Sequence, residues 1–284
     1  MKNTPYTVLM SVYIKEKAEY LKLSIQSMLD QTVPPDEFIL VKDGPLTTEL
    51  DAVVDYYNQK YPGLFTIISN ETNLGLGPAL AKGIVASRNE LIARMDSDDV
   101  SEKTRCEKQL AAFEKDSKLE MVGSFEAEFI GEKDNIVSVH RVPETHNEIT
   151  KFMRRRCAIL HPTVMYKKSA VIRSGNYHSV PLYEDYDLFA RMVLEYNVRS
   201  YNIQENLYYI RTSEDFFKRR GGLKYARTVL NFKWNQHKKG YMSLTDFCIS
   251  GLGQAFVCVL PNTLRKAIVS NKSLYAVLVP CALI

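Results

Sequence analysis

Short apolar runs alternate with amphipathic stretches through the first third of the chain. The apolar runs are rich in β-branched side chains, which is typical of buried strands, and they span residues 6–13, 37–41, 65–68 and 91–95. Between them, apolar residues recur at helical spacing in 15–32, in 50–61 and from 73 onward. This alternation predicts an α/β fold in which helices flank a mostly parallel central sheet.

The remaining two thirds show a less regular pattern. We expect strands at 120–130 and 198–210, an extended segment at 161–166, and helices at 101–118, 146–156 and 184–196. Further helices are expected beyond Arg211, so the chain divides into an α/β domain over residues 1–213 and a helical extension over 214–284. The extension contains two apolar segments, 247–260 and 274–284, each too short to span a bilayer.

Charge separates these two regions more clearly than the mild net charge of +4 suggests. From Glu214 to the end the chain has 11 basic and 3 acidic residues, so the first 213 residues carry about −4. A basic end on an acidic body favours an anionic partner such as a membrane surface or a phosphorylated lipid. Nucleic acid is disfavoured because the sequence contains no recognised nucleic-acid module with interleaved aromatic residues. The apolar segments fit either an interfacial anchor or helices packed on the core.

The five cysteines match neither a zinc site nor a disulfide framework, which favours reduced thiols in a cytoplasmic protein. The first residues lack the apolar run of a secretion signal.

An acidic cluster follows directly after the fourth predicted strand. Asp96, Asp98 and Asp99 lie within four residues, and crowded carboxylates resist ionisation unless a positive partner is present. In parallel sheets, ligands collect beyond the carboxyl ends of strands, and Asp43 ends another strand of the same pattern. Oxygen-only ligands select Mg²⁺ or Mn²⁺. We therefore expect a divalent metal at Asp96 and Asp98 that neutralises a diphosphate. The alternative is a solvated turn that caps the next helix.

Several motifs in a fixed order carry a family resemblance. They are Ser11-Val-Tyr13, Tyr20-Leu, Ser27-Met-Leu-Asp-Gln-Thr32, Val41-Lys-Asp-Gly44, Asn73-Leu-Gly-Leu, Asp96-Ser-Asp98-Asp99, His161-Pro-Thr-Val and Tyr183-Glu-Asp-Tyr-Asp-Leu188. Over residues 5–215 the chain resembles the family-2 inverting glycosyltransferases with the GT-A fold. It is similar to the bacterial enzymes of capsule, exopolysaccharide and O-antigen assembly, including the amylovoran type. The resemblance implies a nucleotide-sugar donor, a divalent metal and inversion at the anomeric carbon, and we expect the donor to be a UDP-sugar.

The resemblance also implies roles for individual residues. Asp43 would contact the uracil or its neighbourhood, Asp96 would reach the ribose or a metal-bound water, and Asp98 would bind Mn²⁺ or Mg²⁺. Asp185 would be the catalytic base, with Glu184 beside it; as charges at a helix start, both would also be favourable without catalysis. The other residues expected to border the nucleotide are Ser11, Tyr13, Lys82 and Arg211.

The sequence departs from the family after Arg211, where many relatives place a histidine close to the diphosphate. Arg211, Arg219 or Arg220 would have to replace it. His161 fits either an acceptor contact or a structural histidine.

The expected acceptor is a saccharide on a polyprenyl diphosphate lipid, and the expected location is the cytoplasmic face of the bacterial inner membrane, bound through the C-terminal region. Two alternatives stay open. A nucleotidyltransferase would need a glycine-rich, basic triphosphate loop after the first strand, and SVYIKEKAEY is not one. An inactive protein that only binds sugar nucleotides would not need Asp98 and Asp185.

Overall fold

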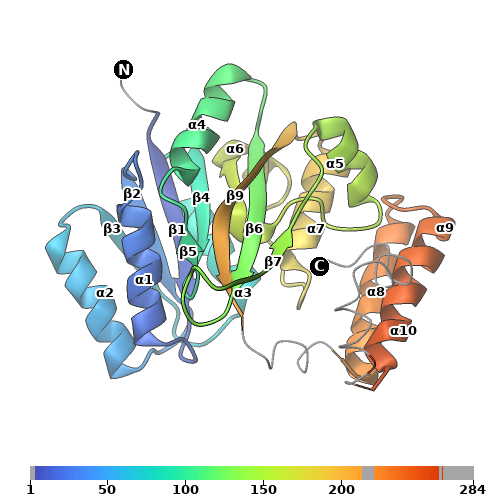
Figure 1. Ribbon diagram of the computed structural model, residues 1–284, viewed down its shortest axis with the longest axis horizontal. Helices are drawn as coiled ribbons and strands as arrows, with labels where there is room; N and C mark the ends of the chain where they lie inside the picture. Colours follow the sequence, from blue (N-terminus) through green and yellow to red (C-terminus); the bar gives the residue numbers. More distant parts are fainter. Residues whose placement is uncertain (1–3, 213–220, 262–263, 265–284) are drawn as a thin grey trace.

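The computed structural model describes residues 4–212, 221–261 and 264 of the chain. Its centre is one mixed sheet with the strand order β3-β2-β1-β4-β8-β6-β9-β5, and β7 pairs with β6 (Figure 1). The strands are β1 (Tyr6–Val12), β2 (Glu37–Lys42), β3 (Phe65–Ser69), β4 (Leu91–Asp96), β5 (Val100–Ser101), β6 (Met121–Phe129), β7 (Ile136–His140), β8 (Met165–Lys167) and β9 (Ser200–Arg211). The predicted α/β class is therefore confirmed.

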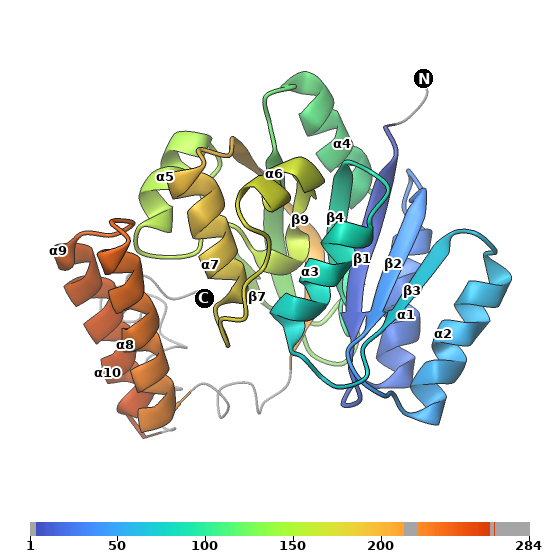
Figure 2. The same cartoon turned by 180° about the vertical axis from the view of Figure 1, so that it is seen from behind.

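The first four strands form the parallel half of the sheet that the sequence predicts. Helices α1 (Ala18–Leu29), α2 (Thr48–Lys60) and α3 (Leu76–Ala86) connect them. Figure 1 shows α1 and α2 on one face of the sheet, and Figure 2 shows α3 on the other. Side chains along β1 alternate accordingly, because successive residues of a strand point to opposite faces. Val8 and Met10 belong to the core under α1 and α2, whereas Leu9 belongs to the core under α3.

The second half of the sheet departs from the sequence prediction in its short elements. The expected extended segment at 161–166 is instead a 3-10 turn, His161–Thr163, followed by β8. Strands β5 and β7 and the helix α6 (Lys168–Arg173) were not predicted. The ladders of β8 with β4 and β6, of β7 with β6 and of β5 with β9 are antiparallel, and β6 pairs with β9 in parallel. Such short antiparallel pairings depend on the partner strand more than on local sequence.

Helices α4 (Arg105–Lys115), α5 (His146–Met153) and α7 (Glu184–Ala190) lie where helices were expected, although α4 and α5 are shorter. Helix α7 continues into a π-helical turn, Arg191–Glu195. A capping box begins α5: the Thr145 hydroxyl accepts from the Glu148 amide, and the Glu148 carboxylate accepts from the Thr145 amide.

The C-terminal helices are α8 (Leu223–Lys238), α9 (Leu244–Phe247) and α10 (Gly253–Val259), with a π-helical turn, Cys248–Leu252, between α9 and α10. They pack on α7: the ring of Phe232 stacks on Tyr183 at 4.1 Å between centroids, and Val229 lies in the same core cluster as Leu188. The expected boundary at residue 213 and the apolar segment 274–284 fall outside the described residues. Among the residues described, no helix combines the length and apolarity that crossing a bilayer requires.

Candidate functional site

Three of the predicted site residues lie side by side at the carboxyl edge of the parallel strands. Ser11 on β1 pairs in register with Asp96 at the end of β4. Strand β1 pairs with β2 on the side away from β4. Just beyond β2, the backbone N–H of Asp43 donates to the carbonyl of Val12 at 2.8 Å. Tyr13 follows β1 at the same edge and is exposed. The sheet therefore brings together residues that are far apart in the sequence, at the edge where ligands of such sheets bind.

Asp96 has a positive partner that the sequence analysis missed. Nη1 of Arg94 lies 2.5 Å from Oδ2 of Asp96, and Nη2 contacts Oδ1, so the pair is bidentate. The Arg94 side chain is 2% exposed and that of Asp96 is 32% exposed. The two residues are two positions apart on a strand, which places both side chains on the same face. That spacing was a readable signal for an ion pair within the cluster.

Asp98 and Asp99 are the crowded members of the acidic cluster. Burial, together with the Asp96 and Glu16 carboxylates, raises the pKa of Asp98 to about 7. Burial, followed by the charges of Asp98 and Asp96, raises the pKa of Asp99 well above its ordinary value. Asp99 accepts a hydrogen bond from the Arg211 backbone N–H at 2.8 Å. Asp98 and Asp99 are thus both crowded carboxylates that a further positive charge would stabilise.

This donor set fits a divalent cation held by few protein ligands. In the described part of the chain, no three His, Cys, Asp or Glu side chains converge on a common metal-binding point. Mg²⁺ and similar ions are commonly held by one or two carboxylates, with water and substrate phosphates completing the shell. Asp98 provides such a carboxylate, and Asp96 reaches the same region while paired with Arg94.

Arg211 supports the acidic loop from the end of β9. Its Nε donates to the carbonyl of Asp98 at 3.1 Å, and its Nη1 donates to the carbonyl of Gly131 at 3.0 Å. The guanidinium also lies over the rings of Tyr20, at 4.1 Å, and Phe129, at 4.6 Å. These contacts fix the conformation of the loop that carries Asp98. The alternative cations Arg219 and Arg220 lie outside the described residues.

Asp43 and Lys82 are connected through Asn70. The Asp43 carboxylate accepts from Asn70 Nδ2 at 3.0 Å and from the backbone N–H groups of Leu74 and Gly75 at 2.9 and 3.0 Å. Lys82 Nζ donates to Asn70 Oδ1 at 2.6 Å. Asp43 is buried, and its bonds hold the turn that starts α3. The role of Asn70 was not anticipated, because a lone asparagine in a loop carries no specific signal.

Glu184 and Asp185 begin helix α7, and Glu184 faces the start of α3. A Cβ atom on Gly77 would lie 3.0 Å from Cγ of Glu184 and 2.6 Å from the His178 carbonyl, so glycine allows the close approach. Burial raises the pKa of Glu184. Because Gly75, two residues earlier, binds Asp43, the first turn of α3 joins the Asp43 side of the site to α7.

Tyr177 is a buried phenol on which the charges of Arg94 and Asp185 both act. Burial raises the pKa of Tyr177 most strongly. The positive charge of Arg94 lowers this pKa, and the negative charge of Asp185 raises it. His161 Nε2 lies 2.8 Å from the Tyr177 hydroxyl, and burial lowers the pKa of His161 well below its ordinary value. His161 is therefore a buried, neutral histidine within the core, which agrees with the structural interpretation of this residue.

Comparison with known proteins identifies relatives over most of the chain. The sequence model of glycosyl transferase family 2 matches residues 7–177. The chain is 35% identical over 266 residues to the UDP-Gal:alpha-D-GlcNAc-diphosphoundecaprenol beta-1,3-galactosyltransferase of Escherichia coli, covering 93% of this chain and 94% of the relative. It is 34% identical over 224 residues to the amylovoran biosynthesis glycosyltransferase AmsE of Erwinia amylovora, covering 78% and 82%.

Solved structures establish the fold. The chain aligns with TarS 1-349 of S. aureus in complex with UDP-GlcNAc at a TM-score of 0.60 and 18% identity, covering 80% of this chain and 65% of that one. It aligns with the mannosyltransferase PcManGT of Pyrobaculum calidifontis, solved with GDP-Man and Mn²⁺, at a TM-score of 0.62 and 14% identity, covering 97% and 81%. The expected GT-A fold is confirmed.

Proposed function

Because the chain belongs to glycosyl transferase family 2, we propose that it transfers a hexose or N-acetylhexosamine from a UDP-sugar to a saccharide carried on a polyprenyl diphosphate. The observation that carries this proposal is the grouping of Ser11, Asp43 and Asp96 at one sheet edge, directly beside Asp98. The E. coli relative, whose name specifies UDP-galactose and a GlcNAc-diphosphoundecaprenol acceptor, supports the choice of substrate classes.

The nucleoside would lie along the edge formed by the ends of β1 and β2. Ser11 and Tyr13 border the base, and Asp43, fixed through Asn70 and Leu74, defines its far side. Lys82 belongs to this side through its bond to Asn70. On the near side, Asp96 accepts from the ribose hydroxyls while Arg94 fixes its orientation. Arg211 acts through the acidic loop, because its donors bind backbone carbonyls there.

Asp98 would hold Mn²⁺ or Mg²⁺, with Asp96 close enough to contribute through water. When bound, such an ion supplies positive charge that stabilises the departing diphosphate. The carboxylate crowding around Asp98 favours a cation at this position before substrate binds. Arg94 reduces the repulsion from Asp96 in the absence of substrate.

Asp185 would act as the general base for a single displacement. Its carboxylate accepts the proton of the acceptor hydroxyl as the oxygen forms a bond to the anomeric carbon. The bond from that carbon to the phosphate oxygen breaks on the opposite side, and its electron pair leaves with UDP. The products are the glycosylated acceptor with inverted configuration, UDP and protonated Asp185. Glu184, beside α3, orders the helix start that positions Asp185.

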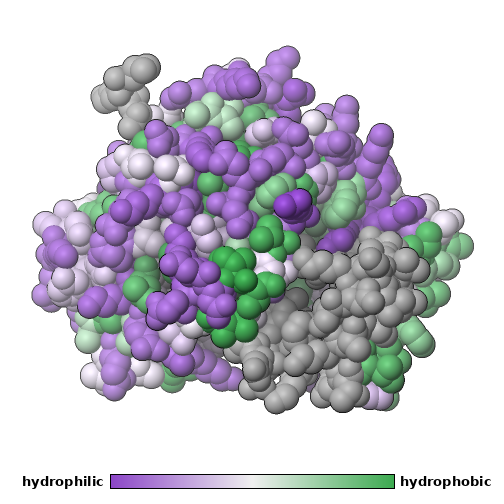
Figure 3. Space-filling view, viewed as in Figure 1, coloured by the Kyte–Doolittle hydropathy of each residue, from purple (hydrophilic) through white to green (hydrophobic). Residues whose placement is uncertain are grey.

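The C-terminal helices would contact the inner membrane at its cytoplasmic face. Their exposed apolar side chains include Leu252 (50% exposed) and Phe256 (56% exposed), and Figure 3 shows hydrophobic surface at the edge where α9 and α10 lie. Flotation with anionic vesicles tests this contact. The Leu252→Ser/Phe256→Ser variant is expected to lose binding, and unchanged flotation would refute the assignment.

A donor screen tests the proposed activity. UDP release is measured for UDP-hexoses and UDP-N-acetylhexosamines with a lipid-diphosphate acceptor, in Mn²⁺ and after chelation. We expect acceptor-dependent release that requires the metal and is lost in Asp98→Asn. Pyrophosphate release from a nucleoside triphosphate would favour the nucleotidyltransferase alternative. Binding of UDP-sugars without turnover by any acceptor would favour an inactive binding protein.

A further inference from the structure

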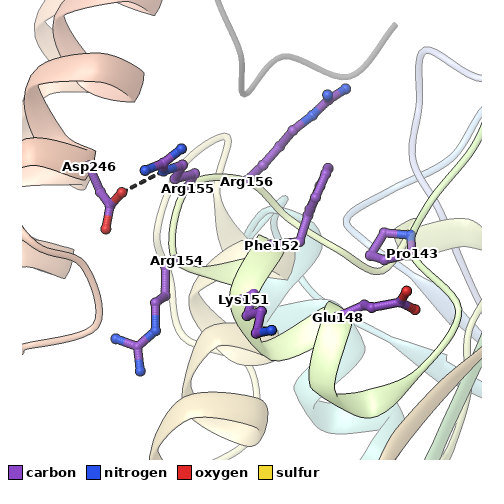
Figure 4. A pocket seen from close by; sticks show the side chains of 8 residues that line it. All are labelled: Pro143, Glu148, Lys151, Phe152, Arg154, Arg155, Arg156 and Asp246. Atoms are coloured by element: carbon purple, nitrogen blue, oxygen red, sulfur yellow. Dashed lines mark hydrogen bonds and ion pairs between the residues drawn. The ribbon is translucent and has the colours of Figure 1, made fainter.

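A basic pocket of about 560 Å³ lies between helix α5 and helix α9, outside the nucleotide edge described above. Its lining includes Lys151 and the consecutive residues Arg154, Arg155 and Arg156. In Figure 4 the lining side chains fan out in different directions: Arg155 reaches toward Asp246, Arg156 extends the other way near Phe152, and Arg154 points away from Arg156. Cations arranged around a space suit an extended anion with several charged oxygens.

The positive charge of this pocket exceeds its negative charge. The carboxylates that line it are Glu148 and Asp246, and both already accept hydrogen bonds from helix-capping residues: Glu148 from Thr145 at 2.8 Å and Asp246 from Ser243 at 2.8 Å. Asp246 also pairs with Arg155 at 2.5 Å.

One further cation, Lys233, strengthens the field of the cations that line the pocket. The buried ammonium of Lys233 donates to the Arg155 carbonyl at 2.5 Å, which places another positive charge behind the arginine segment. Arg154 donates through Nη1 to the Tyr241 carbonyl at only 3.5 Å. A guanidinium carries five N–H donors, so Arg154 can also bind an anion.

The pocket lies close to the proposed catalytic base. The hydroxyl of Tyr186, next to Asp185, donates to the carbonyl of Met153 at 2.8 Å, directly before the arginine segment. On the other side of that segment, burial raises the pKa of Cys157, with Asp185 as the next cause and Lys233 and Arg156 as opposing charges. The charges of Asp185 and Arg156 therefore both act on the Cys157 thiol.

We propose that this pocket binds the diphosphate that links the acceptor saccharide to its lipid. This inference rests on the proposed function, because it places the acceptor hydroxyl at Asp185. A diphosphate bound by Arg154 and Arg156 would leave the attached sugar to extend toward Asp185. A headgroup of a bulk phospholipid carries no sugar to place there, so proximity to the base favours the acceptor.

The test is direct binding by calorimetry, without donor. The probes are GlcNAc-diphosphate carrying an undecyl chain and the same undecyl glycoside without the diphosphate. We expect the wild-type chain to bind the diphosphate probe at least tenfold more tightly. The Arg154→Gln/Arg156→Gln variant is expected to lose this difference, whereas Arg154→Lys/Arg156→Lys should keep most of it. Circular dichroism confirms that each variant is folded.

A matched control removes two other exposed arginines. Arg173 and Arg199 pair with Glu120 and Asp116 outside the pocket, and Arg173→Gln/Arg199→Gln should bind both probes as the wild type does. Equal affinity of the wild type for the two probes would overturn the proposal. Loss of binding to phosphatidylglycerol vesicles in the Arg154/Arg156 variant, with unchanged affinity for the diphosphate probe, would instead assign the pocket to the membrane surface.

The outcomes separate this inference from the proposed activity. If the wild type binds the diphosphate probe selectively and transfers no sugar from any UDP-sugar, the assignment of the pocket is supported and the proposed function is contradicted. If the wild type transfers sugar and the Arg154→Gln/Arg156→Gln variant binds the diphosphate probe with unchanged affinity, the proposed function is supported and the assignment of the pocket is contradicted.

Discussion

The ion pair between Arg94 and Asp96 allows a quantitative prediction about the free energy of unfolding. Arg94→Met keeps a side chain of similar length and removes the guanidinium, which leaves Asp96 beside Asp98 and Asp99 without its bidentate partner. Removing one partner of a fully buried pair costs about 3–5 kcal/mol, whereas exposed pairs contribute about 0–1 kcal/mol. Arg94 is 2% exposed and Asp96 is 32% exposed, so we place the loss in free energy of unfolding at about 2–3 kcal/mol.

Urea unfolding at pH 7, followed by circular dichroism, measures this loss. Arg173→Met is the control, because the Arg173 side chain is 44% exposed and its pair with Glu120 should contribute less than about 1 kcal/mol. Arg94→Lys restores the charge without the two parallel hydrogen bonds, so it should recover only part of the stability. The reasoning is refuted if Arg94→Met loses no more stability than Arg173→Met.

Two further predictions concern α7 and the helices that cover it. Phe232→Ala removes the ring stacked on Tyr183 and should lower the free energy of unfolding by about 3–5 kcal/mol in urea; a loss below about 1 kcal/mol would contradict the packing of α8 on α7. Burial raises the pKa of Asp187, but Arg191 and Lys239 outweigh it and hold the pKa below the ordinary 3.8. Its stabilisation is therefore complete above pH 3.8 and is lost as the pH falls through the lowered value. Asp187→Asn should cost roughly 3 kcal/mol at pH 7, with the difference from wild type shrinking in acid; a constant difference in melting curves would oppose this.

The parallel half of the fold was predictable because local and global signals agree there. Each apolar run from 6 to 95 is followed by an amphipathic stretch, and both faces of the resulting sheet are buried. The short elements were not predictable. Strand β5 has two residues and exists because Val100 and Ser101 pair with β9, more than a hundred residues later. Nothing in such a short stretch distinguishes a strand from a loop.

Only the outline of the candidate site could be predicted from the sequence. The position of Asp43 and Asp96 at strand ends placed them at a common edge, and the structure brings them there. The ion pair of Arg94 was readable from strand alternation and was overlooked because the carboxylates suggested a metal alone. The contacts of Arg211 and Asn70 were not readable, since they depend on how distant loops meet. The hydrogen bond from Tyr186, next to Asp185, to Met153, directly before the arginine segment, likewise depends on the packing of α7 against the end of α5.

The central claim is that Asp185 accepts the proton of the acceptor hydroxyl, while the nucleotide is held at the edge near Asp98. Asp185→Asn tests it most directly, because the amide keeps the size of the carboxylate and removes its basicity. Transfer is measured as acceptor-dependent UDP release, and UDP binding is measured separately by calorimetry. We predict that the turnover rate falls by about 10²–10⁴ while the affinity for UDP stays within about threefold. Turnover within tenfold of the wild type, or loss of UDP binding together with turnover, would contradict the claim.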